Sequence, residues 1–110
     1  MNVQHKDLAA GRWNQLTFLE QMANIGSEVE RAINWRAKNN AVYCKHAFER
    51  ALELMDLTLD SVKNLARLRE LTRVREALVD DFFGDNQFMS RDSSWKKYFS
   101  HFTYAARKDY

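Results

Sequence analysis

Apolar residues recur at intervals of three or four along the first half of the chain, which is the period of one helical face. From position 13 to about position 38 this series comprises Leu16, Leu19, Ala23, Gly26, Val29 and Ile33. From 41 to 59 a wider apolar face comprises Cys44, Ala47, Phe48, Ala51, Leu52, Leu54, Met55 and Leu59. Asn39 and Asn40 separate the two stretches, and asparagine tolerates the left-handed backbone that ends helices. We therefore predict two helices, at about 13–38 and 41–59, joined by a tight turn.

The second half of the chain shows the same period twice more. A polar turn at 60–64, where either Ser61 or Asn64 can cap the next helix, precedes an apolar series from 65 to 83. The segment 84–86, which begins with Gly84, is expected to supply a left-handed stop. Caps at 90–92 then precede a strongly aromatic helix at about 93–107. Because short loops between four helices favour antiparallel neighbours, we expect an all-α, antiparallel up-down four-helix bundle.

Length and composition restrict the class of protein. A chain of 110 residues fits a single domain that spans 1–110, and 45% apolar with 29% charged residues is typical of a globular protein. No apolar run approaches the roughly 20 residues of a membrane span, and Met1 to Lys6 lacks the apolar stretch of a secretory signal. We therefore expect no membrane segment and a cytoplasmic protein. The single cysteine, Cys44, agrees with a reducing compartment.

No motif in the sequence demands a particular catalytic chemistry. The three glycines are isolated, which excludes the glycine-rich turns of nucleotide-binding folds. Cys44 and His46 are two residues apart and point to different faces of a helix, so they cannot share a metal ion. We therefore predict no catalytic residue, no metal and no other cofactor. If the protein is an enzyme, His101 is the candidate general base, a role that histidine commonly takes.

Charge is segregated along the third predicted helix. Residues 61–75 contain five basic residues and one acidic residue, whereas 76–92 contain five acidic residues and one basic residue. This order opposes the helix dipole, so groups outside the helix should compensate. In an up-down bundle, the basic half lies beside the end of the last helix, which would gather Arg67, Arg69, Arg73, Arg107 and Lys108. We predict an anion-binding surface there, with Arg69 and Arg73 as its first test. The alternative is that these cations pair with Glu53, Asp56 and Asp60.

Large apolar side chains at helix ends indicate association. Four of them are expected to be exposed, namely Trp35, Phe83, Phe88 and Trp95. Contiguous exposed apolar patches usually mark an interface. We therefore predict a symmetric homodimer.

One hairpin resembles a known family. The run from Ser27 to Arg36, the Asn39-Asn40 turn and the alanine- and glutamate-rich run from Ala47 to Leu54 resemble the first helical hairpin of HEPN-domain proteins. The resemblance implies a helical bundle that commonly dimerises. It also implies a nucleotide- or RNA-associated module, often beside a nucleotidyltransferase or in a toxin–antitoxin system.

The sequence departs from those HEPN members that cleave RNA, which carry an arginine a few residues before a histidine on a late helix. Arg91 lies too far before His101, and Arg36 lies too far before His46. We therefore predict a non-catalytic helical module for binding or assembly, whose partner is a protein or an anionic ligand such as a nucleotide or RNA. Two alternatives stay open: a HEPN-like ribonuclease or nucleotide-modifying enzyme that uses His101 with arginines, and a structural subunit of a larger complex.

Overall fold

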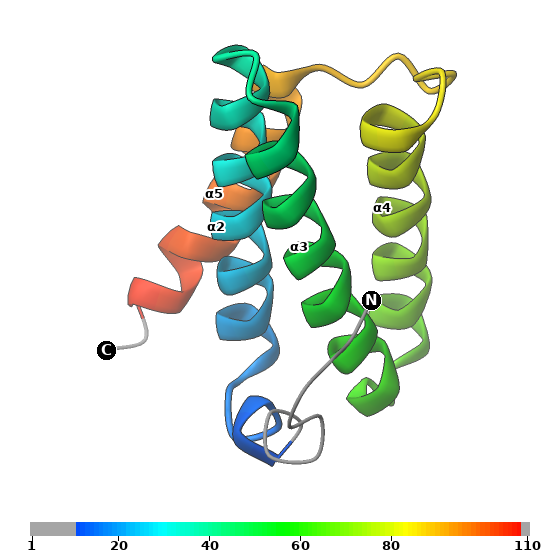
Figure 1. Cartoon of the computed structure of the whole chain (residues 1–110). Helices are drawn as coiled ribbons and strands as arrows, with labels where there is room; N and C mark the ends of the chain where they lie inside the picture. Colours follow the sequence, from blue (N-terminus) through cyan, green and yellow to red (C-terminus); the bar gives the residue numbers. More distant parts are fainter. Residues whose placement is uncertain (1–10, 109–110) are drawn as a thin grey trace.

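Helices make up most of the computed structural model, which describes residues 11–108. They are α2 (Phe18–Ala37), α3 (Ala41–Ser61), α4 (Leu65–Phe83) and α5 (Asp92–Lys108), and residues 11–13 are also helical (Figure 1). Residues 11–108 contain no strand, so the predicted all-α class is confirmed. None of the helices described is long and apolar enough to cross a membrane. The expectation of no secretory signal rests on the segment from Met1 to Lys6, which lies outside the described residues.

Helix α2 begins five residues later than the predicted start at 13, because a capping box fixes its first turn. The Thr17 hydroxyl accepts a hydrogen bond from the Glu20 backbone N–H at 3.1 Å, and the Glu20 carboxylate accepts one from the Thr17 N–H at 2.9 Å. Trp13 precedes this cap and is buried, and its indole N–H donates to the Thr58 hydroxyl at 2.9 Å. The segment before α2 is therefore anchored to α3 instead of extending α2.

Asparagines cap the next two helices: Asn64 is one of the two caps predicted for α4, whereas the cap at Asn40 was not predicted. The Asn40 side chain accepts from the Tyr43 N–H at the start of α3, and the preceding Asn39 has the expected left-handed φ of 59°. The Asn64 side chain accepts from the Arg67 N–H at the start of α4. Helix α3 runs two residues beyond its predicted end, to Ser61, and α4 has its predicted bounds.

The left-handed residue predicted within 84–86 is Asn86 and not Gly84. Gly84 ends α4 in an extended conformation with φ −115°, and its N–H donates to the Asp80 carbonyl at 3.0 Å. The left-handed residues of this loop are Asn86, with φ 53°, and Met89, with φ 55°. Helix α5 then begins at Asp92 and ends at Lys108, one residue outside its predicted bounds at each end.

Helix α2 is the centre of the packing, because α3 and α5 both pack against it while α4 packs against α3. Figure 1 shows α5 crossing α2 obliquely and ending away from α4. The most deeply buried side chains of the core are at most 2% exposed, and they include Met22, Ile25, Val29, Ile33, Phe48, Met55, Leu71 and Leu78. The closed up-down arrangement stays a prediction. Helix α5 crosses α2 so that residues of both helices line one cleft.

Candidate functional site

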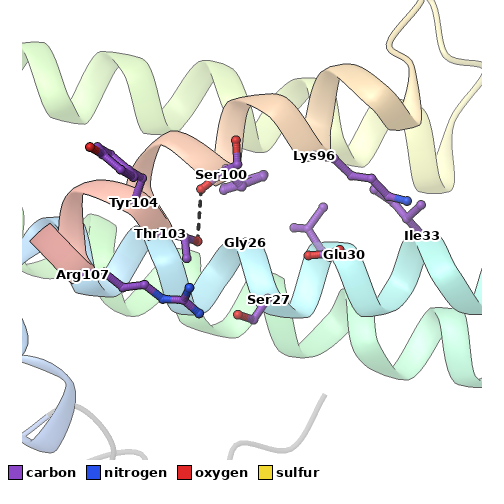
Figure 2. Close-up of a pocket in the computed structure, with 11 residues that line it drawn as sticks. Gly26, Ser27, Glu30, Ile33, Lys96, Ser100, Thr103, Tyr104 and Arg107 are labelled. Carbon is purple, nitrogen blue, oxygen red and sulfur yellow. Dashed lines mark hydrogen bonds between the residues drawn. The ribbon is translucent and has the colours of Figure 1, made fainter.

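Helices α2 and α5 border a cleft of about 290 Å³ that is lined by side chains of both (Figure 2). The two helices approach closely because Gly26 has no side chain. A Cβ at Gly26 would lie 2.6 Å from the Cβ of Phe99, which is closer than real Cβ contacts. Val29, Ile33 and Phe99 are buried and give the cleft an apolar floor. The crossing at Gly26 therefore determines both the position and the shape of the cleft.

Two cations of α5 line the cleft without an internal partner. Lys96 and Arg107 are exposed, and neither forms an ion pair or a hydrogen bond with a side chain in residues 11–108. Their separation of eleven residues corresponds to about 16 Å along a helix. Figure 2 shows Arg107 extending towards Ser27 of α2 and Lys96 at the opposite end. Glu30 of α2 lies between them and is likewise unpaired within the described chain. The cleft therefore has a positive charge near each end and one carboxylate between them.

Three aliphatic hydroxyl groups line the cleft besides the phenol of Tyr104, and each of the three donates its proton to a carbonyl of its own helix. Ser27 donates to the Ala23 carbonyl at 3.2 Å, Ser100 to that of Lys97 at 2.8 Å, and Thr103 to that of Phe99 at 3.4 Å. Since each hydroxyl proton is already engaged, the oxygen lone pairs are what these groups can offer to a ligand. The cleft therefore presents hydrogen-bond acceptors along its walls and charged donors near its ends.

Tyr104 adds an aromatic ring to the cleft. It lies on α5 one turn before Arg107, and its side chain is 70% exposed. Its ring makes no aromatic or hydrogen-bond contact with other residues in 11–108. An exposed ring beside an unpaired guanidinium can stack on a flat ligand group while the cation holds an anionic one.

The structure divides the predicted anion-binding surface. Arg107 lines the cleft, and Lys108 is exposed at the end of α5 without lining it. The Arg67 guanidinium lies over the Phe18 ring, 4.6 Å from its centroid. Arg69 and Arg73 line a separate hollow formed by residues 66–74 of α4 alone, with Glu70 between them. The predicted surface is therefore divided among α4, the α2–α4 contact and α5.

The alternative prediction, in which the arginines of α4 pair with acidic residues of α3, is not met by Arg69 or Arg73 in the described residues. Within residues 11–108, neither Arg69 nor Arg73 forms an ion pair with Glu53, Asp56 or Asp60. Asp56 instead pairs with Arg75, whose Nε lies 3.0 Å from the carboxylate. Arg69 and Arg73 are thus not paired with these acidic residues, and anion binding itself stays a prediction.

Arg36 of α2 supplies a positive charge that compensates the acidic C-terminal end of α4. Its guanidinium pairs with Asp81 at 3.1 Å and with Asp92 at 2.7 Å, and it lies 4.0 Å from the centroid of the Phe82 ring. Partial burial opposes the charge on Arg36, but its hydrogen bonds and Coulomb attraction to the two aspartates outweigh this effect and raise its pKa. The cluster links α2, α4 and the first residue of α5, and so holds the start of α5 against α2.

The prediction that Trp95 is an exposed interface residue is wrong. Trp95 is only 7% exposed, because its indole N–H donates to the Asp81 carboxylate at 2.8 Å within the Arg36 cluster. Trp35 is half-buried and packs edge-on against the Tyr43 ring, with centroids 4.8 Å apart. Phe83 and Phe88 are exposed. Of the four predicted interface residues, Phe83 and Phe88 are therefore the two that are more than half exposed.

The two histidines among residues 11–108 lie outside the cleft. His46 and His101 are both exposed, and His101 does not line the space between α2 and α5. No group of three or more His, Cys, Asp or Glu residues between positions 11 and 108 is arranged to hold a metal ion. His101 therefore takes no part in the chemistry of the cleft.

Sequence reasoning found Arg107 but missed Lys96, Ser100 and Thr103. A signal for them exists, because positions 96, 100, 103 and 107 are spaced by four, three and four and so form one polar stripe beside the aromatic face of α5. A buried glycine in the middle of α2 was the second signal, since it marks close approach of another element.

The chain was compared with models of protein families, with curated proteins and with solved structures, and it matches none of them.

Proposed function

We propose that this protein is a non-catalytic binding module that holds a nucleotide-type ligand in the α2/α5 cleft. The observation that carries the proposal is the pair Tyr104 and Arg107, which lie one turn apart on α5 beside the cleft and have no partner in residues 11–108. A guanidinium binds phosphate through two parallel hydrogen bonds, and an exposed aromatic ring stacks on bases of any sequence.

The remaining groups of the cleft suit the rest of such a ligand. Ribose hydroxyls and base amino groups are donors, and the oxygens of Ser27 and Thr103 and the carboxylate of Glu30 are acceptors. Lys96 lies about 16 Å from Arg107 along the helix, a distance that a short single strand can span with a later phosphate. A free nucleotide and a single-stranded RNA therefore share the same binding chemistry at Arg107 and differ at Lys96.

The cleft is a better candidate than the hollow at Arg69 and Arg73. That hollow is lined by one stretch of a single helix, so it offers no facing wall, and Glu70 lies between its two cations. The cleft has walls on two helices and an apolar floor. The resemblance of residues 27–54 to HEPN-domain proteins, a family of nucleotide- and RNA-associated modules, favours the same class of ligand.

The test is an equilibrium titration of the full chain with fluorescently labelled single-stranded RNA at low salt, with unlabelled ATP as a competitor. Arg107→Glu is compared with Lys108→Glu, which makes the same charge change at the next residue outside the cleft. Because a hydrogen bond to a charged group contributes about 1.5–3 kcal/mol, we expect Arg107→Glu to weaken binding about 10- to 100-fold. Lys108→Glu should cost much less.

Each outcome of this titration has a defined meaning. Displacement of the RNA by ATP supports a free nucleotide as ligand, whereas binding of RNA alone, weakened by Lys96→Glu, supports a strand. Equal losses from Arg107→Glu and Lys108→Glu would show only general electrostatic attraction and contradict the cleft. A loss confined to charge reversal at Arg69 and Arg73 would move the site to α4. No binding of either probe at low salt would refute the proposed function.

A further inference from the structure

Exposed apolar side chains gather at the end of the molecule where α3 begins and α4 ends. Val42 and Tyr43 in the first turn of α3, Phe83 at the end of α4, and Phe88 and Met89 in the loop 84–91 are each more than half exposed. Figure 1 places these segments together at the top of the molecule. We term this surface the apolar end. A patch of this kind on a small protein usually marks an interface.

Hydrogen bonds hold the loop 84–91 in one conformation. The Asp80 carboxylate accepts the backbone N–H groups of Gln87 and Phe88 at 2.9 and 3.0 Å. The Asn86 side chain accepts from the Ser90 N–H at 2.9 Å and donates to the Ser90 carbonyl at 3.0 Å. These four bonds fix the backbone on both sides of residues 88 and 89.

The fixed loop directs two apolar side chains into solvent. Phe88 is 66% exposed and Met89 is 81% exposed. Met89 has a φ of 55°, in the left-handed region that a methionine rarely adopts. Backbone strain that the surroundings enforce in this way is concentrated at binding surfaces and switch segments. The loop therefore presents Phe88 and Met89 as a preformed apolar projection.

A hollow of about 370 Å³ lies next to this projection, between the end of α2, the start of α3 and the end of α4. Its apolar lining includes Cys44, Phe48, Phe82 and Phe83, and Lys45 lies among its lining residues. Neither Phe88 nor Met89 lines it, so the loop of the same chain does not fill it. We term it the Cys44 hollow. It shares no lining residue with the α2/α5 cleft.

We propose that the Cys44 hollow receives Phe88 and Met89 of a second copy of this chain, in a two-fold symmetric dimer. The projection and the hollow lie side by side at the same end of the molecule, so one two-fold axis can place each projection in the other copy's hollow. Surfaces on opposite sides of the molecule would instead build an open chain. One pair of charges is also complementary, because Asp85 is exposed at the start of the projecting loop and Lys45 is exposed at the hollow, while Arg91 lies at the other end of the loop.

The first test is the mass in solution, measured by sedimentation equilibrium over a range of concentrations. We expect wild type to reach twice the monomer mass of 13.0 kDa. The double variant Phe88→Ser/Met89→Ser should raise the dimer dissociation constant at least about 10-fold, because truncating the central apolar anchors of an interface usually has such an effect. Tyr104→Ser is the matched control, since Tyr104 is equally exposed but lies on α5, and it should leave the dimer intact.

The second test identifies the occupant of the hollow by a disulfide between copies. A Met89→Cys/Cys44→Ser chain is mixed with wild type and oxidised with diamide at alkaline pH, because burial raises the pKa of the Cys44 thiol. A disulfide-linked heterodimer is expected. Tyr104→Cys/Cys44→Ser is the control and should give little cross-linking.

Four results would overturn the proposal. They are a wild-type chain that stays monomeric, a dimer that survives Phe88→Ser/Met89→Ser, equal cross-linking by the Tyr104→Cys control, and no cross-link from Met89→Cys. Binding of RNA or ATP in the cleft does not enter either test, so this proposal and the proposed function can fail separately.

Discussion

Replacing Gly26 with alanine should lower stability, although the same change in an exposed helix would raise it. Alanine is favoured over glycine in a helix interior by about 1 kcal/mol. At Gly26, however, the new methyl carbon would lie 2.6 Å from the Phe99 Cβ and 2.9 Å from its Cγ, whereas carbon atoms prefer roughly 3.5–4.0 Å. The Phe99 Cβ is fixed to the backbone of α5, so the helix itself must move. Overpacking of this kind costs about 1–3 kcal/mol.

The two effects leave a net loss of about 1 kcal/mol, and for a domain of this size the melting temperature should fall by roughly 4–8 °C. The assay is urea unfolding followed by far-UV circular dichroism. Asn34→Ala is the control, because Asn34 is exposed on the same helix and its side chain makes no described hydrogen bond. It should gain up to about 0.7 kcal/mol from helix propensity alone. A Gly26→Ala variant that is stabilised as much as Asn34→Ala would refute the close crossing of α2 and α5.

Three further predictions concern the core, the ion-pair cluster and alkaline pH, and urea unfolding measures all of them. Phe48→Ala should cost about 3–5 kcal/mol because the ring is fully buried, whereas Phe83→Ala should cost far less; equal losses would contradict the assigned core. Asp81→Ala should cost about 1.5–3 kcal/mol, because it removes the acceptor of the Trp95 indole N–H and one of the two carboxylates that bind the Arg36 guanidinium. Asp92→Ala should cost less than about 1 kcal/mol because Asp92 is 48% exposed, and the reverse order would argue against the cluster. Burial and a hydrogen bond to the Glu70 carboxylate raise the pKa of Tyr98 above its ordinary value of 10.0. The contribution of Tyr98 to the free energy of unfolding should therefore be fully present below pH 10 and should be lost as the pH rises further. The variant Tyr98→Phe should weaken this loss.

The helices were largely predictable because their ends carry local chemistry. Helix α4 has its predicted bounds, since Asn64 caps its start and a glycine follows its last residue. The start of α2 was missed although Thr17 and Glu20 form a capping signature, because the apolar period continues upstream through Leu16. At the start of α2 the apolar period and the cap indicate different residues, and the helix begins at the cap. The reason is that the cap supplies acceptors for backbone N–H groups that otherwise have no partner within the helix.

The site was less predictable, because it depends on how α5 crosses α2. The sequence identifies Arg107 as an available cation, but an idealised bundle places it beside Arg69 and Arg73 of α4. In the structure α5 ends away from α4, and Arg107 lies against α2 near Ser27. Neither residue spacing nor loop length specifies that angle. It follows from the close contact of Gly26 with Phe99 and from the Arg36 cluster, both of which involve residues far apart in the sequence.

The most direct test of the proposed function is NMR mapping of a nucleotide on the ¹⁵N-labelled chain. ATP is titrated into wild type at low salt while the backbone amide signals are recorded. We expect saturable shifts at Gly26, Ser27, Tyr104 and Arg107, with little change along α4. The Arg107→Glu variant should need about 10- to 100-fold more ATP to reach the same shifts. Shifts confined to Arg69 and Arg73, or none that saturate with either ATP or single-stranded RNA, would contradict ligand binding in the α2/α5 cleft.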